Sequence, residues 1–275
     1  MSYQKSQMSF KVFIGVMLAV LGTLTFFPFL WMIFSSLKTN AEISQMVPTL
    51  LPKNPTLNNF KELFERLNFG IYLKNTLIVT LFSFLGLFLN AMAGYGFSKY
   101  DFKGKHGLFL LVLATMMIPG QVTMIPVYLI LNSVGLTNTL MGIVLPGLAG
   151  AFGIFLFRQF MSTISDELLE AARLDGANEW YIFFRIVLPL TRPILAVQGI
   201  LTFIGGWNSF LWPLIIANDE KYYTLSVGLQ LLQGQHGTDY SLQMAGATFM
   251  VVPILIVFMI FQKYILQGFN VSGIK

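Results

Sequence analysis

The sequence contains no cysteine and only two histidines, His106 and His236. Without a thiol, the chain forms no disulfide, has no cysteine nucleophile and offers no thiolate to a metal ion. The two histidines fall in different predicted loops, so they do not form one metal site. We therefore expect no metal in this chain.

A phosphate-binding loop of the pattern G-x-x-x-x-G-K-[ST] is also absent from the sequence. Gly104-Lys105 is the nearest approach, but it lacks the upstream glycine and the hydroxyl residue that a nucleotide site needs. We expect that the chain holds no cofactor, does not hydrolyse ATP by itself and is not an enzyme.

Charge is scarce as well. Only 11% of the residues are charged, against about a quarter in an average soluble domain, and 55% are hydrophobic. A membrane span needs about 20 predominantly apolar residues. The chain offers charge-free runs at 12–34, 75–98, 107–157, 193–218 and 241–262. Because the third run is long enough for two spans around a polar turn at 132–139, we predict six.

The expected fold is therefore an all-α membrane protein, with one membrane domain covering 1–275. The predicted spans are approximately 11–36, 73–98, 107–131, 139–161, 192–217 and 242–266. Between the fourth and the fifth lies a polar loop at 162–190.

Lysine and arginine set the expected orientation. Apart from Lys221 and those of one longer loop from Lys38 to Lys74, they gather on the side that holds the amino terminus. This favours a multi-pass protein of a bacterial plasma membrane, with both termini and the loop 162–190 cytoplasmic. The apolar run after Lys5 and Lys11 continues too far for a signal peptide. The basic pI of about 9.3 then indicates contact with anionic lipid, and no nucleic-acid partner is expected.

The loop 162–190 predicts a helix, a tight turn and a second helix. Four apolar residues recur close to helical spacing, namely Leu168, Leu169, Ala172 and Leu174. Asp166 lies near the start of the first helix, where the helix dipole favours anions, and Gly176 can end that helix in a left-handed conformation. Asn178 can cap the second helix, which Pro189 leads toward the next span.

This loop resembles the cytoplasmic coupling loop of ATP-binding-cassette importer permeases. The resemblance lies in Glu170-Ala171-Ala172, in Gly176 and in the closing Leu188-Pro189, and Leu174-Asp175-Gly176-Ala177 is similar to the carbohydrate-importer branch. Further segments resemble maltose- and glycerol-phosphate-type permeases, so nearly the whole length is covered. These segments are Ala93–Gly104, Met117–Val122, Phe152–Phe160 and Trp207–Leu214.

The resemblance implies that the chain forms half of a translocation path. Its implied partners are a second related permease, two cytoplasmic ATPases that bind ATP and magnesium, and an extracytoplasmic sugar-binding protein. The implied ATPase-coupling residues are Glu170, Ala171, Ala172, Arg173, Asp175, Gly176, Leu188 and Pro189. The small side chains of Ala171 and Ala172 would let a partner approach closely, while Glu170 and Arg173 would fix the angle of docking. The alternative is an ordinary amphipathic helix on the bilayer.

The predicted spans carry charged residues only near their ends, at Lys11, Lys74, Arg158, Arg192 and Lys263, and none in the apolar runs between them. Transporters coupled to protons or sodium commonly carry ionisable groups in their spans, so energy is expected to arrive from outside the membrane. A stand-alone secondary transporter or channel for a neutral solute stays open, because backbone carbonyls at broken helices can also bind sodium. A membrane scaffold without a path is a third alternative.

Neutral polar residues recur on single faces of two spans, as a path for a hydroxyl-rich neutral sugar would require. The candidate path residues are Asn90, Gln121, Gln198, Thr202, Asn208, Ser209 and Trp212. Helix packing is the competing interpretation, favoured for Gly86, Gly94, Gly205 and Ser83. For Trp207 and Trp212 we favour anchoring at the membrane interface. Pro119-Gly120 and Pro126 are expected to bend or break the third span.

Outside the spans, the loop 38–74 predicts an amphipathic helix capped by Asn58 or Asn59, with Phe60, Leu63, Phe64 and Leu67 on one face. It either rests on the bilayer or receives a binding protein. A second loop, 217–240, is another candidate contact. The terminal segment 267–275 resembles a tail that in some relatives reaches between the ATPases, and a flexible cytoplasmic end is equally expected.

Overall fold

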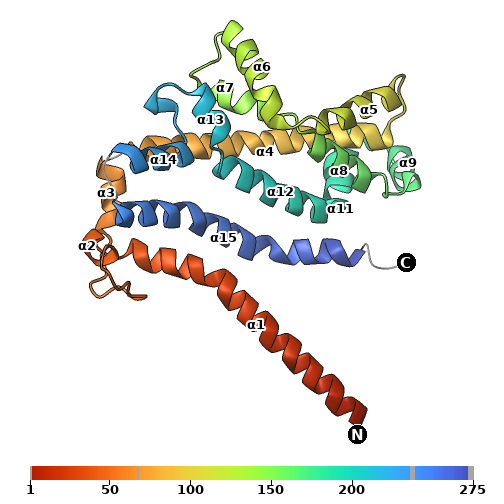
Figure 1. Ribbon diagram of the computed structural model, residues 1–275. Helices are drawn as coiled ribbons and strands as arrows, with labels where there is room; N and C mark the ends of the chain where they lie inside the picture. The colour runs from red at the N-terminus through yellow and green to blue at the C-terminus, as the bar shows by residue number, and fades with distance from the viewer. Residues whose placement is uncertain (1, 67, 236–238, 272–275) are drawn as a thin grey trace. The chain divides into compact units, whose positions relative to one another are not determined.

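The chain was analysed as a computed structural model that describes residues 2–66, 68–235 and 239–271. Within these ranges it consists of helices and their connections, without a strand (Figure 1). The all-α prediction is confirmed. Leu67, His236 and the last residues of the terminal segment, 272–275, lie outside the described residues.

The helices are labelled as in Figure 1. They are α1 (Ser2–Ser36), α2 (Asn40–Ile43), α3 (Asn58–Arg66), α4 (Phe69–Lys99), α5 (Lys105–Met116), α6 (Gly120–Ser133), α7 (Leu140–Val144), the 3-10 turn η1 (Leu145–Gly147), α8 (Ala151–Met161), α9 (Asp166–Leu174), α10 (Glu179–Tyr181), the π-helical η2 (Ile182–Val187), α11 (Leu188–Leu190), α12 (Arg192–Trp207), α13 (Leu211–Ile216), the 3-10 turn η3 (Glu220–Tyr222), α14 (Leu225–Gln235) and α15 (Tyr240–Val271).

Five segments of the described chain are long and apolar enough to cross a membrane. They are Phe10–Ser36, Phe69–Lys99, Leu140–Met161, Arg192–Ile216 and Tyr240–Gln262. Each lies at the place of a predicted span. The helix of the fourth predicted span is interrupted by η1, and that of the fifth is interrupted between α12 and α13.

The predicted third span, 107–131, is not one straight helix. It consists of α5 and α6, which are bent by 105° at a short break and give a sixth span only if the pair is counted together. Pro119 lies at the break and precedes the first residue of α6. Since proline has no N–H and clashes with the preceding turn, a helix ends readily before it. Pro126, by contrast, lies within α6, which continues through it.

The chain divides into two compact units. The first comprises residues 1–67 and 229–249 and contains α3, whose Leu63 is fully buried. Asn58 and Asn59 both lie within α3, so neither is the predicted cap that precedes it. Asn59 makes a different contact. Its buried side-chain amide donates to the carbonyls of Ser36 and Lys38, at 2.7 Å each. Asn59 therefore fixes α3 to the end of α1.

The second unit comprises residues 68–228 and 250–275, and α8 and α12 lie along α4 in it (Figure 1). Glycine permits this close packing. A Cβ at Gly94 would lie 2.5 Å from Cβ of Phe157, and one at Gly206 would lie 2.9 Å from Cα of Thr80. The predicted packing role of Gly94 agrees with this geometry, because small residues let helices approach in a membrane.

An apolar core at one end of α4 joins it to α8, α9 and η2. Its buried members are Ala91, Tyr95, Phe157, Met161, Leu169, Ile182, Phe183 and Val187. Leu169 is the contribution of α9 to this core. α9 is thus packed onto the long helix through its one buried leucine, with the partly buried Ala172 beside it.

Candidate functional site

The first helix of the loop 162–190 ends as its glycine predicts. Gly176 has φ +85°, in the left-handed region that side-chain-bearing residues rarely adopt. The N–H of Ala177 donates to the carbonyl of Ala172 and that of Gly176 to the carbonyl of Arg173, each at 3.0 Å. This pair of bonds forms a Schellman motif, which satisfies carbonyls at the end of α9.

The second helix of the loop begins at its predicted cap. Oδ1 of Asn178 accepts a hydrogen bond from the N–H of Tyr181 at 2.8 Å. The chain then runs through α10, the π-helical η2 and α11, which begins with Leu188 and Pro189. The predicted helix, turn and helix are therefore present in sequence order, and the π-helical stretch between them was not predicted.

Fewer of the predicted coupling residues of α9 are exposed than the sequence suggested. Glu170 and Ala171 are exposed, and Leu174 keeps 89% of its surface. Ala172 instead packs against the core beside Leu169. Close approach of a partner is thus possible at Ala171 and at the turn after Leu174, whereas Ala172 is partly covered by the core.

The side chain of Arg173 already has a hydrogen-bond partner within the loop. Its Nε donates to Oε1 of Glu179 at 2.7 Å, and the hydroxyl groups of Tyr100 and Tyr95 donate to Oε2 of the same carboxylate at 2.5 and 3.3 Å. Arg173 and then Tyr100 hold the pKa of Glu179 below its ordinary value, whereas burial and the bond to Glu179 raise the pKa of Tyr100. Glu179 and both tyrosines were not predicted as site residues from the sequence. The two tyrosines lie within the segment Ala93–Gly104, which had been singled out only for its resemblance.

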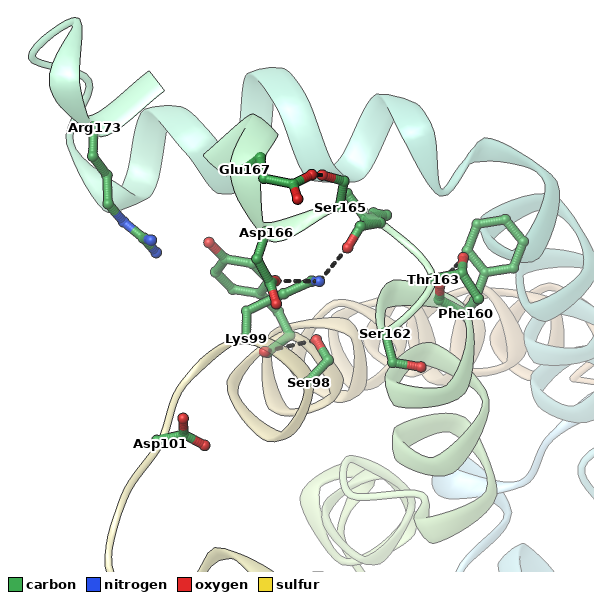
Figure 2. Close-up of polar contacts among 12 residues, drawn as sticks. Ser98, Lys99, Asp101, Phe160, Ser162, Thr163, Ser165, Asp166, Glu167 and Arg173 are labelled. Atoms are coloured by element: carbon green, nitrogen blue, oxygen red, sulfur yellow. Dashed lines mark hydrogen bonds and ion pairs between the residues drawn. The ribbon is translucent and has the colours of Figure 1, made fainter. Parts of the chain in front are cut away.

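A second polar contact lies at the start of α9. Lys99, the last residue of α4, places Nζ 2.6 Å from Oδ1 of Asp166 and also donates to the carbonyl of Ile164 (Figure 2). Lys99 lowers the pKa of Asp166, chiefly through this hydrogen bond. Asp166 therefore has a specific partner, beyond the favourable helix dipole that the sequence indicated.

A cavity of about 450 Å³ lies among α4, α6, α7, α12 and α13 in the second unit. Its polar lining includes Ser83, Asn90, Thr123, Thr202, Ser209 and Trp212. Four predicted path residues, Asn90, Thr202, Ser209 and Trp212, are thus brought together from two different spans. No charged side chain of the described residues is among those that line it.

The other three predicted path residues do not line this cavity. Gln121 and Asn208 are exposed elsewhere, and Gln198 is buried. The Nε2 atom of Gln198 has no hydrogen-bond partner in the part of the chain that the structure describes. Of the predicted stripe, Thr202, Gly205, Ser209 and Trp212 line the cavity, whereas Gln198 is buried away from it. Asn208, predicted beside the stripe, is the exposed residue that follows α12.

Three polar side chains near the cavity hold the helices around it. Oδ1 of Asn90 accepts from the N–H of Gly150 at 2.9 Å, just before α8. Nε1 of Trp212 donates to the carbonyl of Gly142 at 3.1 Å, and Nε1 of the buried Trp207 donates to that of Met250 at 2.9 Å. The anchoring predicted for Trp207 is wrong, because its ring is buried and its N–H is satisfied within the protein.

Comparison with known families decides what kind of protein this geometry belongs to. Residues 83–271 match the family described as binding-protein-dependent transport system inner membrane component. The chain belongs to this family. It is therefore a multi-pass inner-membrane permease component, and this family favours a binding-protein-dependent system over a stand-alone transporter, a channel or a scaffold.

Individual members of the family are similar over almost the whole chain. The arabinooligosaccharides transport system permease protein AraQ of Bacillus subtilis strain 168 is 35% identical, over 97% of this chain and 96% of its own. The lactose transport system permease protein LacG of Rhizobium radiobacter is 31% identical, over 91% and 92%. Among solved structures, a chain of a bacterial ABC transporter involved in the import of the acidic polysaccharide alginate is 25% identical, over 94% and 98%, with a TM-score of 0.83.

Proposed function

We propose that this permease is one half of the membrane path of an ATP-driven carbohydrate importer, and that α9 is its docking helix for a cytoplasmic ATPase. The observation that carries this proposal is the turn at Gly176, placed beside an exposed surface in a member of a binding-protein-dependent family. The relatives named for arabinooligosaccharide and lactose transport support a sugar as the solute.

The docking surface that we propose is made of five of the residues that α9 and its turn leave exposed, namely Glu170, Ala171, Leu174, Asp175 and Gly176. Leu174, the last residue of α9, is almost fully exposed and offers an apolar contact, while Glu170 and Asp175 offer negative charge. Burying an apolar side chain at the centre of an interface and pairing a charge beside it is a common arrangement of interfacial contacts. Leu188 and Pro189 would act indirectly, by directing the second helix toward α12.

The proposed assembly contains this chain, a second related permease and two ATPases that supply the ATP and magnesium sites. A sugar-binding protein would deliver the solute on the opposite side. Both termini and α9 would then be cytoplasmic, in agreement with the distribution of lysine and arginine. The short external helix α3 and the loop around η3 are the candidate contacts for the binding protein.

The cavity at Asn90, Thr202, Ser209 and Trp212 is the proposed part of the path in this subunit. Hydroxyl and amide groups satisfy sugar hydroxyls, and an indole ring suits the apolar face of a sugar ring. A neutral solute fits a lining without charged side chains. Because a structural relative belongs to an importer of an acidic polysaccharide, competition by neutral and acidic sugars has to be compared directly.

Affinity purification of the tagged subunit from membranes tests the proposal. We expect an ATPase and a second permease to be retained, and sugar uptake by the reconstituted complex to require ATP and a binding protein. A subunit that transports alone, without an ATPase, would refute the proposed function. The orientation is tested by an impermeant maleimide, since the chain has no native thiol. A cysteine at Ala171 should react only from the cytoplasmic side, and one at Asn218 only from the other.

A further inference from the structure

The carboxyl-terminal end of α4 contacts the start of α9 directly and is joined to its last turn through Glu179 of α10. From this arrangement we infer that Lys99 and Tyr100 are positioning residues of the importer, and that α4 is the helix through which movement of the docking helix reaches the cavity. This inference rests on the proposed function. It names the residues of this chain that link docking to the path.

The contact at the start of α9 is made by a buried ammonium group. The side chain of Lys99 is only 3% exposed, and it donates both to the carboxylate of Asp166 and to the carbonyl of Ile164 (Figure 2). A buried cation that loses one partner keeps the cost of its desolvation, so the pair resists separation. The start of α9 is therefore expected to follow the end of α4.

The contact at the other end of α9 is made through Glu179. Its carboxylate binds Arg173, in the last turn of α9, and also accepts the hydroxyl groups of Tyr95 and Tyr100 from α4 and the residue that caps it. One carboxylate thus joins α9, the second helix of the loop and α4. Hydrogen bonds between charged partners are short and directional, so this contact fixes an angle as well as a distance.

The apolar core between these two contacts does not supply the same restraint. Leu169 is the buried residue of α9 in that core, and burial of apolar surface is non-directional. A helix attached through Leu169 and the small methyl group of Ala172 can rotate about this apolar contact. The polar contacts on either side of Leu169 prevent this rotation, which is why they are assigned the positioning role.

Residues of α4 also line the cavity. Val79, Ser83, Leu87 and Asn90 of α4 are among the lining residues, and Asn90 also holds the N–H of Gly150 at the start of α8. From Asn90 to Lys99 the helix rises roughly 13 Å, at about 1.5 Å per residue. The sequence of α4 contains no proline, so no proline kink interrupts this segment. A shift of α9 would therefore be carried along α4 to the cavity.

The test uses the reconstituted importer with its own ATPases, second permease and binding protein. Lys99→Met and Tyr100→Phe should leave the assembled complex intact and lower the sugar transported per ATP hydrolysed, by about tenfold for Lys99→Met, because a charge-assisted bond is lost. Tyr100→Phe, which removes one hydroxyl group, should have a smaller effect of the same kind. Lys99→Arg should restore most of the ratio, because it keeps the positive charge.

The matched control is Lys105→Met. Lys105 forms an ion pair with Asp101 at 3.1 Å, near the same end of α4, but this pair does not involve α9. Its removal should leave the transport ratio unchanged. If Lys99→Met prevents assembly, Tyr100→Phe carries the test, because the core around Tyr95 remains in place.

The outcomes separate this inference from the proposed function. A wild-type subunit that retains no ATPase would refute the proposed function itself. A coupled wild-type importer in which Lys99→Met and Tyr100→Phe keep the normal ratio of sugar to ATP would refute only the positioning role. A proportional loss of uptake and ATP hydrolysis would also count against it, since that pattern indicates less active complex and not weaker coupling.

Discussion

Arg173 and Glu179 form an ion pair across the turn at Gly176, with 2.7 Å between Nε and Oε1. The pair closes the helix-turn-helix on itself and occupies the guanidinium group that the sequence had assigned to a docking contact. Glu170 and Arg173, the two charged residues expected to set the docking angle, are both exposed. Within the described ranges of the chain, only Glu170 of the two forms no salt bridge. Partner recognition at this surface is therefore expected to depend on Glu170 and on the turn.

Replacing Gly176 by valine should weaken ATPase retention without removing the subunit from the membrane. No atom lies within 4 Å of the position of an added Cβ, so the effect would come from the backbone angle and not from a clash. A β-branched residue in the left-handed region costs on the order of 1–2 kcal/mol. The measurement is the amount of ATPase that copurifies per permease.

Gly176→Asn is the control for this variant, because asparagine tolerates the left-handed conformation better than other residues with a side chain. It should retain nearly normal amounts of ATPase. Equal retention by the valine and asparagine variants would show that the conformation of the turn is unimportant for docking.

Gly94→Ala should destabilise the subunit by overpacking the contact of α4 with α8. The added Cβ would meet Cβ of Phe157 at 2.5 Å and the backbone nitrogen of Arg158 at 2.8 Å. The backbone cannot yield locally, so we expect a loss on the order of 1–3 kcal/mol, seen as a lower thermal unfolding midpoint. Gly96→Ala, in the same helix with open space around its Cβ position, should not lower it.

The cavity predicts opposite outcomes for two polar residues of α12. Thr202→Val removes a lining hydroxyl at nearly constant volume and should reduce uptake by roughly two- to tenfold, as one lost hydrogen bond would. Gln198→Met removes a buried amide whose nitrogen has no partner within the described chain, and should leave uptake unchanged and the yield of complex equal or higher. Uptake that falls only in the Gln198 variant would place the path elsewhere.

The contact of Glu179 with Arg173 and Tyr100 should be lost in acid and not near neutrality. The pKa of Glu179 lies below the ordinary value of 4.5. Its ionised form therefore contributes stability that is fully present above pH 4.5 and is lost as the pH falls through the lower pKa of the folded state. The difference in unfolding temperature between wild type and Glu179→Gln should therefore be constant from about pH 6 to about pH 8. The difference in unfolding temperature should become smaller only below 4.5, the ordinary pKa of a glutamate. A difference that changes near neutrality would point to another titrating group.

The sequence by itself determined the elements whose causes are local. A long apolar run specifies a helix that can cross a membrane, and five such runs predicted the places of the five long apolar segments. Gly176 and Asn178 specify a turn because each acts on its own backbone and on residues only a few positions away. The loop 162–190 was predictable for this reason.

The tertiary structure alone decided which side chains meet. Periodicity placed Gln198 and Thr202 on one face of a helix, but it contains no information on which neighbouring helix covers each turn of that face. Lys99 and Asp166 lie far apart in the chain, as do Glu179 and Tyr100, and no local pattern encodes such contacts. The cavity and the two contacts of α9 with α4 therefore follow from long-range packing, which close glycine contacts permit and buried polar groups orient.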